Sequence, residues 1–306
     1  MRILVSGGTG IVGRYIVEGL SLAGYAVTIG GRHRPEPGMF PAPMKYMPIT
    51  LDPEIDQTGA FDGVDALVHA AFSHVPGRYR GGEGDDPQGF RRLNLEGSAR
   101  LFRTAKRAGV ARCIFLSSRA VYGDTGNGAM SFEGMEPEPA TLYGEVKIEA
   151  ERALFASGDT EFTTVSLRPT GIYGDLRPNK WDRLIDNYLA GRPVSGCAGT
   201  EVHGRDVARA VSLLLEADPR FVAGHAFNLS DIRTDTHEIL EIVQQVTRSP
   251  HPLPEASAHA ITGEMDTSRI RALGWTGGGK ALFEETIRNL CKTLQPAPDL
   301  GGWSGI

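Results

Sequence analysis

The sequence has few cysteines and no long apolar run. Its three cysteines, Cys113, Cys197 and Cys291, are isolated from one another and odd in number, which argues against a disulfide framework and against paired zinc ligands. No stretch approaches the roughly 20 apolar residues that span a membrane, and the residues after Met1 lack the apolar core of a signal peptide. We therefore expect a cytoplasmic protein with inert thiols and no membrane attachment.

The sequence also has no excess of basic over acidic residues. The chain has 32 Lys and Arg residues against 37 Asp and Glu residues, a formal net charge of −5. This balance gives no overall attraction to nucleic acids or to anionic membrane surfaces, so we expect neither as a partner. With 306 residues and 41% hydrophobic composition, the chain can bury a sizeable core. We expect a folded protein that acts on a small molecule.

Short β-branched runs alternate with longer helical patterns along the chain. The predicted strands are Arg2 to Ser6, Ala26 to Ile29, Ala66 to Ala70, Arg112 to Ser117, Phe162 to Arg168 and Ala226 to Leu229. The predicted helices are Ile11 to Leu22, Arg91 to Ala108, Leu142 to Ala156, Asp206 to Ala217 and Thr236 to Thr247. This alternation predicts an α/β fold with a Rossmann-type, doubly wound parallel sheet.

The alternation becomes less regular after about Asp175. We therefore expect residues 1–174 to form the main domain and residues 175–306 to form a smaller, mainly substrate-binding region. One strand of that region, near residues 225–230, is expected to return to the large sheet. The Pro- and Gly-rich stretches 34–43 and 76–89 predict surface loops, and the second is long enough to suggest a function.

A glycine-rich segment follows the first predicted strand and opens the first helix. Gly7 permits a tight turn, Gly10 allows the backbone to approach a phosphate, and Gly13 allows the helix to pack closely on the strand. The helix would begin at Ile11 and Val12, where backbone amides and the positive end of the helix dipole favour an anion. The pattern and its position predict that the main domain binds a dinucleotide.

The end of the second strand bears on the choice of cofactor. NAD-binding chains usually have an acidic residue there, which binds the adenosine ribose hydroxyls. This chain has Gly31 followed by Arg32, with Arg34 close behind. Guanidinium groups favour a ribose 2′-phosphate, so NADP is the preferred cofactor and NAD the alternative. The competing interpretation is that both arginines belong to a solvated loop.

Ser118, Tyr143 and Lys147 form the candidate catalytic centre. Ser118 follows a predicted strand, and the spacing of four residues places Tyr143 and Lys147 on one face of a helix. An adjacent ammonium and a positive nicotinamide ring both favour the phenolate form of a tyrosine. Tyr143 could then exchange a proton while hydride moves at a secondary alcohol or ketone, with Ser118 bonded to the substrate oxygen.

These motifs resemble those of the extended short-chain dehydrogenase/reductase superfamily, also called the NAD-dependent epimerase/dehydratase family. The resemblance covers residue 1 to about 290 and rests on the glycine-rich segment and on Leu67 to Ala71, Leu93 to Gly97, Leu116 to Ser118, Val121 to Gly123, Tyr143 to Lys147, Leu167 to Pro169, Ile172 to Gly174 and Phe227 to Ser230. It implies that Asn94 supports Lys147 through water and that Lys147 also binds the nicotinamide ribose. It further implies that Ala70, Ala71 and Pro169 contact the cofactor.

The same resemblance implies a homodimer formed through the helices at 91–108 and 142–156.

Two departures from the family pattern concern the reaction and the substrate. Dehydratases of this family carry Thr-Asp-Glu where this chain has Ser118-Arg119-Ala120, so the carboxyl groups needed to expel water are missing. Members that bind nucleotide sugars place an arginine at the position of Gly199. Its possible replacements are Arg78, Arg80, Arg91, Arg92, Arg177 and Arg205.

We therefore expect an NAD(P)-dependent oxidoreductase or epimerase that acts on a sugar-like substrate and is not a dehydratase. A sugar, a sugar acid and a nucleotide sugar remain open as substrates, as does the choice between epimerase and dehydrogenase. The alternative is a non-catalytic NADP(H) sensor or scaffold, against which the intact catalytic residues argue.

Several other side chains have less specific interpretations. His69 is expected to pack near the cofactor, while His74 and His203 have no partners at metal-ligand spacing, so we expect no metal. Phe72, Tyr173 and Trp181 could line a substrate pocket or belong to the core.

Overall fold

The computed structural model describes residues 1–75, 82–123, 129–257 and 264–293. Its centre is a seven-stranded sheet in which every neighbouring pair of strands is parallel, with the order β3-β2-β1-β4-β5-β6-β9. The strands are β1 (Arg2–Ser6), β2 (Ala26–Gly31), β3 (Lys45–Pro48), β4 (Ala66–His69), β5 (Arg112–Leu116), β6 (Thr163–Pro169) and β9 (His225–Leu229). The predicted doubly wound α/β fold is confirmed, and β3 is a strand that the sequence analysis missed.

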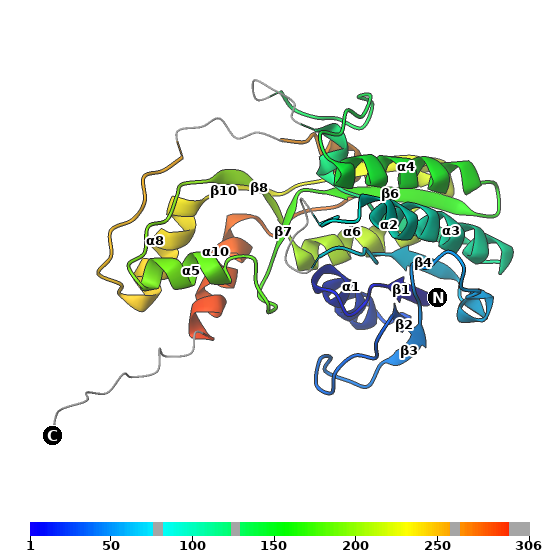
Figure 1. The fold of residues 1–306 in the computed structure, drawn as a ribbon, viewed down its shortest axis with the longest axis horizontal. Coiled ribbons are helices and arrows are strands. Elements are labelled where there is room, and N and C mark those ends of the chain that lie inside the picture. The colour runs from blue at the N-terminus through cyan, green and yellow to red at the C-terminus, as the bar shows by residue number, and fades with distance from the viewer. Residues whose placement is uncertain (76–81, 124–128, 258–263, 294–306) are drawn as a thin grey trace.

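Helices cover both faces of this sheet (Figure 1). On one face α1 (Ile11–Leu22) packs against α6 (Gly204–Glu216), where Gly19 makes room for Ala208. On the other face α3 (Ser98–Arg107) packs against α4 (Leu142–Ser157). The central strands β4 and β6 are buried along their whole length, as expected for a parallel sheet covered on both sides.

The predicted helix over 91–108 consists of three consecutive pieces. These are α2 (Pro87–Arg91), a π-helical turn η2 (Arg92–Gly97) and α3. A β-carbon at Gly97 would overlap the carbonyl oxygen of Leu51, so this helix passes unusually close to the backbone after β3. The predicted loop 34–43 contains no helix or strand. Of the second predicted loop, residues 87–89 are helical and 76–81 lie outside the described residues.

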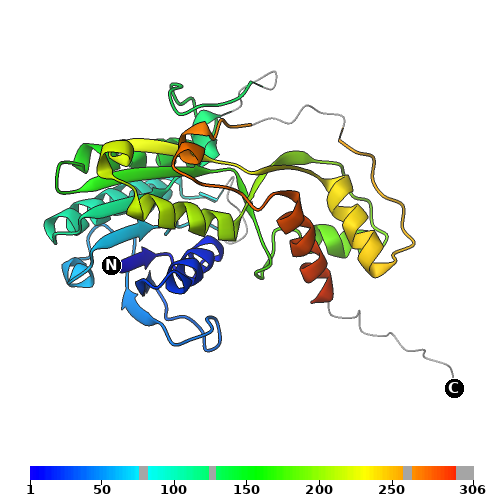
Figure 2. The same cartoon turned by 180° about the vertical axis from the view of Figure 1, so that it is seen from behind.

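A smaller part of the molecule lies to one side of the large sheet (Figures 1 and 2). It contains a three-stranded sheet with the order β10-β8-β7, made of β7 (Gly171–Tyr173), β8 (Ala198–His203) and β10 (Ile232–Asp235). Around it lie α5 (Asp182–Leu189), α8 (Thr236–Thr247) and α10 (Gly279–Lys292), which share a core with Tyr173 and Trp181. The short helices α7 (Pro219–Val222) and α9 (Ser268–Ala272) contact the large sheet instead.

Within the described residues, no helix is both long enough and apolar enough to cross a membrane. Cys113 and Cys291 are buried thiols, whereas Cys197 is exposed. The strand β9 returns to the large sheet beside β6, where the sequence analysis expected a strand.

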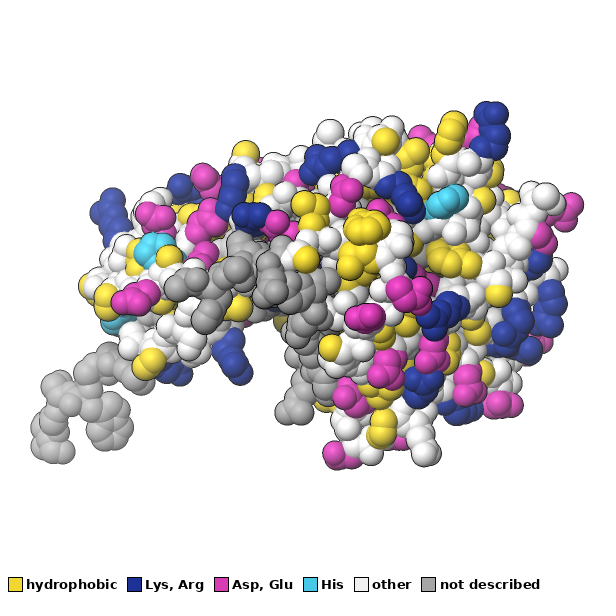
Figure 3. Space-filling model, turned by 90° about the horizontal axis from the view of Figure 1, so that it is seen from above, with side chains coloured by type: hydrophobic (Ala, Val, Ile, Leu, Met, Phe, Trp, Pro, Cys, Tyr) yellow, Lys and Arg dark blue, Asp and Glu magenta, His cyan; other side chains and the backbone are white. Residues whose placement is uncertain are grey.

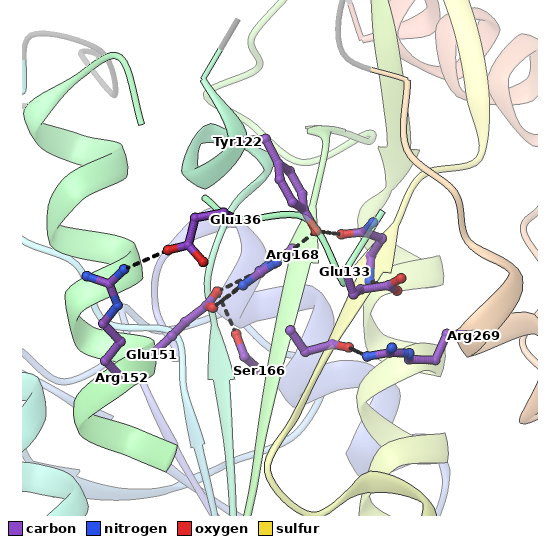
Figure 4. A network of polar contacts seen from close by, with 10 residues as sticks. Tyr122, Glu133, Glu136, Glu151, Arg152, Ser166, Arg168 and Arg269 are labelled. Atoms are coloured by element: carbon purple, nitrogen blue, oxygen red, sulfur yellow. Dashed lines mark hydrogen bonds and ion pairs between the residues drawn. The ribbon is translucent and has the colours of Figure 1, made fainter. Parts of the chain in front are cut away.

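A network of buried polar groups joins α4 to the sheet (Figure 4). The Arg168 guanidinium on β6 donates to both carboxylate oxygens of Glu151 on α4, with Nη2 to Oε2 at 2.5 Å and Nε to Oε1 at 3.0 Å. Arg168 also donates to the Tyr122 hydroxyl, which donates to Asn228 on β9. Ser166 donates to Glu151 as well. All five side chains are buried, and together they connect α4, β6, β9 and the segment before α4.

Removing one member of this network should be costly, because it leaves a buried charge without its partner. We expect Glu151→Gln to lower the free energy of unfolding by about 3–5 kcal/mol. The matched control is Arg220→Ala, which breaks an ion pair with Asp218 in which the Arg220 side chain is 81% exposed, so that solvent screens the attraction and the loss of stability should be much smaller than in Glu151→Gln. Urea midpoints measured at an unchanged slope test this, and equal losses in the two variants would contradict it.

Candidate active site

A cavity of about 620 Å³ opens at the carboxyl ends of β1, β2, β4, β5 and β6. This is where ligands bind in open α/β sheets. Most of the predicted site residues line it, namely Gly7, Gly10, Ile11, Val12, Gly13, Arg32, Ala70, Ala71, Ser118, Tyr143, Lys147 and Pro169. The sequence analysis missed several other lining residues, among them Thr9, Ser73, Thr170 and Lys180.

The three glycines of the β1–α1 loop have different surroundings. Gly7 has a φ of 73°, and a β-carbon there would lie 2.6 Å from the amide nitrogen of Ala71. A β-carbon at Gly13 would overlap the carbonyl oxygen of Gly7. At Gly10 the nearest atom to such a β-carbon is 3.3 Å away. Gly7 and Gly13 are therefore required by packing, whereas a β-carbon at Gly10 would make one tight contact and no overlap.

The first turn of α1 suits an anion. Its first helical hydrogen bond runs from Arg14 to the Gly10 carbonyl, which leaves the amides of Ile11, Val12 and Gly13 without helical acceptors. Among the described residues, no side chain caps this end of α1, and its first turn contains no acidic residue. These amides and the helix dipole fit the pyrophosphate of a dinucleotide.

After the end of β2, Arg32 and Arg34 have different surroundings, although the sequence analysis considered them together. Arg32 is exposed and lines the cavity. Arg34 instead packs over the ring of Tyr46, 5.0 Å from its centre. A β-carbon at Gly31 would lie 3.7 Å from Thr9 and His33, an ordinary contact, so packing does not exclude a side chain there. The absence of a carboxylate at this position therefore has no steric cause.

Ser118 and Tyr143 lie on separate elements that pack together. Ser118 follows β5, and its hydroxyl accepts a hydrogen bond from Ala120 at 3.1 Å, at the start of the 3₁₀ turn η3 (Arg119–Tyr122). Tyr143 lies in the first turn of α4, which Thr141 caps through the amide of Gly144. Gly144 allows the two elements to meet, because a β-carbon there would overlap the carbonyl oxygen of Ala120.

Lys147 is buried behind Tyr143. Its Nζ donates to the carbonyl oxygen of Leu116 at 2.6 Å and lies 4.4 Å and 4.7 Å from the ring centres of Phe72 and Phe115. Burial lowers the pKa of Lys147 to about 7, although the negative charge of Glu151 opposes this shift. The lysine therefore changes charge near neutral pH, and a negative group beside it would favour the ammonium form.

Asn94 is buried in η2 and does not line the cavity. Its side chain accepts from the amide of Ser73 at 2.7 Å and donates to the carbonyls of Ser73 and Phe90. Asn94 thus positions the backbone at Ser73, which does line the cavity. Its role toward Lys147 through water stays a prediction.

Two of the remaining predicted side chains prove to be structural. His69 has hydrogen bonds to Ser6 and Ser98, and burial, assisted by the charge of Lys147, lowers its pKa to about 3. Trp181 stacks on Tyr173 in the core of the smaller part of the molecule. Phe72 lines the cavity, and Tyr173, although it belongs to that core, also contributes to the cavity wall.

None of the four described arginines that were expected to replace one at Gly199 reaches the cavity, and Gly199 itself has no neighbouring atoms within contact distance of a β-carbon. The four described candidates form ion pairs and do not line the cavity: Arg91 with Glu149, Arg92 with Asp52, Arg177 with Asp182 and Arg205 with Asp175. Arg78 and Arg80 lie outside the described residues.

Comparison with known proteins agrees with the fold. The sequence model of the NAD dependent epimerase/dehydratase family matches residues 3–230. Human sterol-4-alpha-carboxylate 3-dehydrogenase, decarboxylating, is 31% identical over 196 residues, and the match covers 62% of this chain and 50% of the relative. The chain thus spans about half the length of that relative. UDP-glucose 4-epimerase of Neisseria meningitidis serogroup C is 27% identical over 289 residues, covering 79% and 80%.

Among solved structures, UDP-glucuronic acid 4-epimerase from Bacillus cereus in complex with NAD is similar with a TM-score of 0.78. The match covers 95% of this chain and 98% of that chain at 18% identity. This likeness concerns the fold.

The different surroundings of Gly10 and Gly13 can be tested with alanine. We expect Gly10→Ala to change the free energy of unfolding by less than about 1 kcal/mol, because its β-carbon would meet only the Gly7 carbonyl oxygen, at a tight 3.3 Å. NADPH affinity should fall at least roughly tenfold, because the added methyl group crowds the loop that is proposed to bind the phosphates. Gly13→Ala should instead lower stability by about 1–3 kcal/mol through overpacking. Urea unfolding and fluorescence titration measure the two effects. Wild-type NADPH affinity in Gly10→Ala would show that the cradle does not bind phosphate.

Proposed function

Because the chain belongs to the NAD-dependent epimerase/dehydratase family, we propose that it is an NAD(P)-dependent oxidoreductase or epimerase acting at a secondary alcohol or ketone of a sugar-like substrate. The observation that carries this proposal is the single cavity that joins the glycine cradle to Ser118, Tyr143 and Lys147. The chemistry supplied by a bound nicotinamide is the acceptance or donation of hydride. The homodimer and the cytoplasmic location expected from the sequence stay predictions.

In the proposed mechanism, the chain's own residues hold and move the proton. Ser118 hydrogen-bonds the substrate oxygen, and Tyr143 takes the hydroxyl proton during oxidation or returns it during reduction. Lys147 is close enough to Tyr143 for the two charges to influence each other, since its Nζ lies 5.9 Å from the centre of the Tyr143 ring. A phenolate favours the ammonium form of Lys147, and the ammonium favours the phenolate.

The lining of the cavity supports this reaction over dehydration. Expulsion of water needs a carboxyl acid and base, and the part of the cavity wall formed by described residues contains no Asp or Glu. At the positions where dehydratases of this family carry carboxyl groups, Arg119 and Ala120 line the cavity. The sterol dehydrogenase and the sugar epimerase named above are consistent with a secondary alcohol as the reacting group.

NADP is the proposed cofactor, because Arg32 lines the cavity and no carboxylate stands at Gly31. We expect NADPH to bind more tightly than NADH, and Arg32→Ala to remove roughly tenfold to a hundredfold of NADPH affinity, as for a charged hydrogen bond. Gly31→Asp should reverse the preference, since there is room for the side chain. Arg34→Ala is the matched control and should leave both affinities unchanged, because Arg34 packs on Tyr46. Equal affinities of the wild-type protein for the two cofactors would remove the basis for NADP.

The catalytic assignment predicts different effects at Tyr143 and Lys147. Tyr143→Phe keeps the ring and its edge contact with Phe72, 5.1 Å between centres, but removes the transferred proton. Its turnover should fall by roughly 10²- to 10⁴-fold with folding and cofactor affinity unchanged. Lys147→Ala should weaken cofactor binding as well. Near-wild-type turnover of Tyr143→Phe with a true substrate would refute the assignment.

Mass spectrometry of the purified protein addresses the choice between the two enzyme types. An epimerase retains its cofactor through each cycle, whereas a dehydrogenase must release it. A tightly held dinucleotide that co-purifies would therefore support an epimerase. A protein that takes up cofactor only reversibly would support a dehydrogenase.

A further inference from the structure

Tyr15 on α1 contacts the loop between β7 and α5, which consists of residues 174–181. Its hydroxyl donates to the Asp175 carboxylate at 2.8 Å and accepts from the backbone amide of Leu176 at 2.9 Å. Burial raises the pKa of Tyr15 above its ordinary value, so the hydroxyl keeps the proton that it donates. Figures 1 and 2 show this loop beside α1. The helix that begins at the glycine cradle is therefore hydrogen-bonded to a loop of the smaller part of the molecule.

The ring of Tyr15 fills a space that two glycines leave open. A β-carbon at Gly174 would overlap the Tyr15 hydroxyl, and one at Gly204, at the start of α6, would overlap the Tyr15 ring. The ring also packs edge-on against His203, with 5.5 Å between the ring centres, and Tyr15 is only 3% exposed. The smaller part of the molecule projects to one side of the larger part (Figure 3). Tyr15 is thus a closely packed contact at the junction of the two parts.

The loop 174–181 forms part of the cavity wall on the side of the smaller region, which we expect to bind the substrate. The Asn179 side chain braces the loop internally, because its Nδ2 donates to the carbonyl oxygens of Gly174 and Leu176. The contact with Tyr15 therefore places a braced unit relative to α1. The lining residues that this loop contributes are Gly174, Leu176, Pro178, Asn179 and Lys180.

The path from the proposed cofactor site to this loop is short. The phosphates are proposed to bind the amides of residues 11–13, and Tyr15 lies about one helical turn after Ile11. An anion bound to these amides would hold the first turn of α1 in place. The two hydrogen bonds of the Tyr15 hydroxyl then extend this restraint to Asp175 and Leu176.

We propose that Tyr15 is a positioning residue that couples cofactor binding to the placement of the loop 174–181, so that the bound dinucleotide prepares the cavity for the substrate. This inference rests on the proposed function, because it requires a dinucleotide in the glycine cradle. Coupling between two sites is reciprocal, so a substrate held by the loop would tighten cofactor binding by the same factor. Tyr15 has no part in the proton transfer assigned to Ser118 and Tyr143.

Hydrogen exchange of the loop tests this inference without a substrate. Mass spectrometry follows the backbone amides of residues 174–181 with and without a saturating concentration of NADPH or NADH, whichever binds more tightly. The ratio of the two exchange rates measures the coupling between cofactor and loop. We expect the cofactor to slow exchange in the wild-type protein at least roughly fivefold.

Tyr15→Phe keeps the ring between Gly174 and Gly204 but removes both hydrogen bonds to the loop. Cofactor affinity should stay within about threefold of wild type, while the slowing of exchange by cofactor should fall below about twofold. A merely structural role would give a different result. Exchange would then become faster by the same factor with and without cofactor, and their ratio would not change.

Three further variants act as controls. Tyr25→Phe removes a hydroxyl that donates to Glu216 beyond the other end of α1, and it should keep the wild-type ratio. Asp175→Asn keeps a side-chain oxygen that can accept from Tyr15 and should retain most of the cofactor effect, whereas Asp175→Ala should lose much of it. Both changes at Asp175 remove the charge that pairs with Arg205, so their difference isolates the acceptor.

The outcomes separate this inference from the function on which it rests. Failure of the wild-type protein to bind NADPH or NADH would refute the proposed function. Cofactor binding that does not slow exchange in residues 174–181 would overturn the inference alone. Slowing that persists in Tyr15→Phe would also overturn it, because the cofactor would then act on the loop by another route. If Tyr15→Phe fails to bind cofactor, the comparison of Asp175→Asn with Asp175→Ala decides, and equal ratios in these two variants would overturn the inference.

Discussion

The position of α4 against the sheet determines the geometry of the active site. Tyr143, Lys147 and Glu151 follow one another at intervals of four residues and therefore share one face of this helix. Lys147 is bonded to the Leu116 carbonyl on β5, and Glu151 is bonded to Arg168 on β6. A shift of α4 by one turn would leave both buried charges without their partners, which is strongly unfavourable. These two contacts therefore fix the position of α4, and with it the position of the Tyr143 phenol at the cavity.

The strand β6 connects this arrangement with the substrate side of the cavity. Arg168 belongs to the buried network, and the next two residues, Pro169 and Thr170, line the cavity. The chain then continues into β7 and the smaller sheet. The backbone amide of Thr170 donates to Leu229 on β9, which holds this crossing in place. The two parts of the molecule are therefore joined at the cavity by a strand that is anchored on both sides.

Local sequence patterns predicted most of the large sheet and the candidate site. The strand β1 and the helix α1 were predicted with their observed bounds, because apolar periodicity and the flanking glycines are local signals. The break of the second helix at η2 depends on the contact between Gly97 and Leu51, which no local pattern contains. The three-residue strand β7 is too short to show a period. These features depend on tertiary contacts.

The same limit applies to single side chains of the site. The sequence gives no reason to prefer Arg32 over Arg34 as the residue that binds the cofactor. The structure distinguishes them, because Arg34 packs on Tyr46 of β3, a strand that the sequence analysis did not predict.

The net charge of the chain differs in sign from the charge on the described wall of the cavity. The net charge of −5 is a property of the whole chain and bears on long-range attraction to polyanions. The described wall of the cavity is cationic because acidic residues are placed elsewhere: Glu201 pairs with Lys180 just behind the wall, and Glu151 faces Arg168 in the core. Coulomb energy varies with distance and local dielectric constant, so groups within a few ångströms dominate inside such a cavity. An acidic protein can therefore enclose a site selective for anions, and its overall composition does not reveal it.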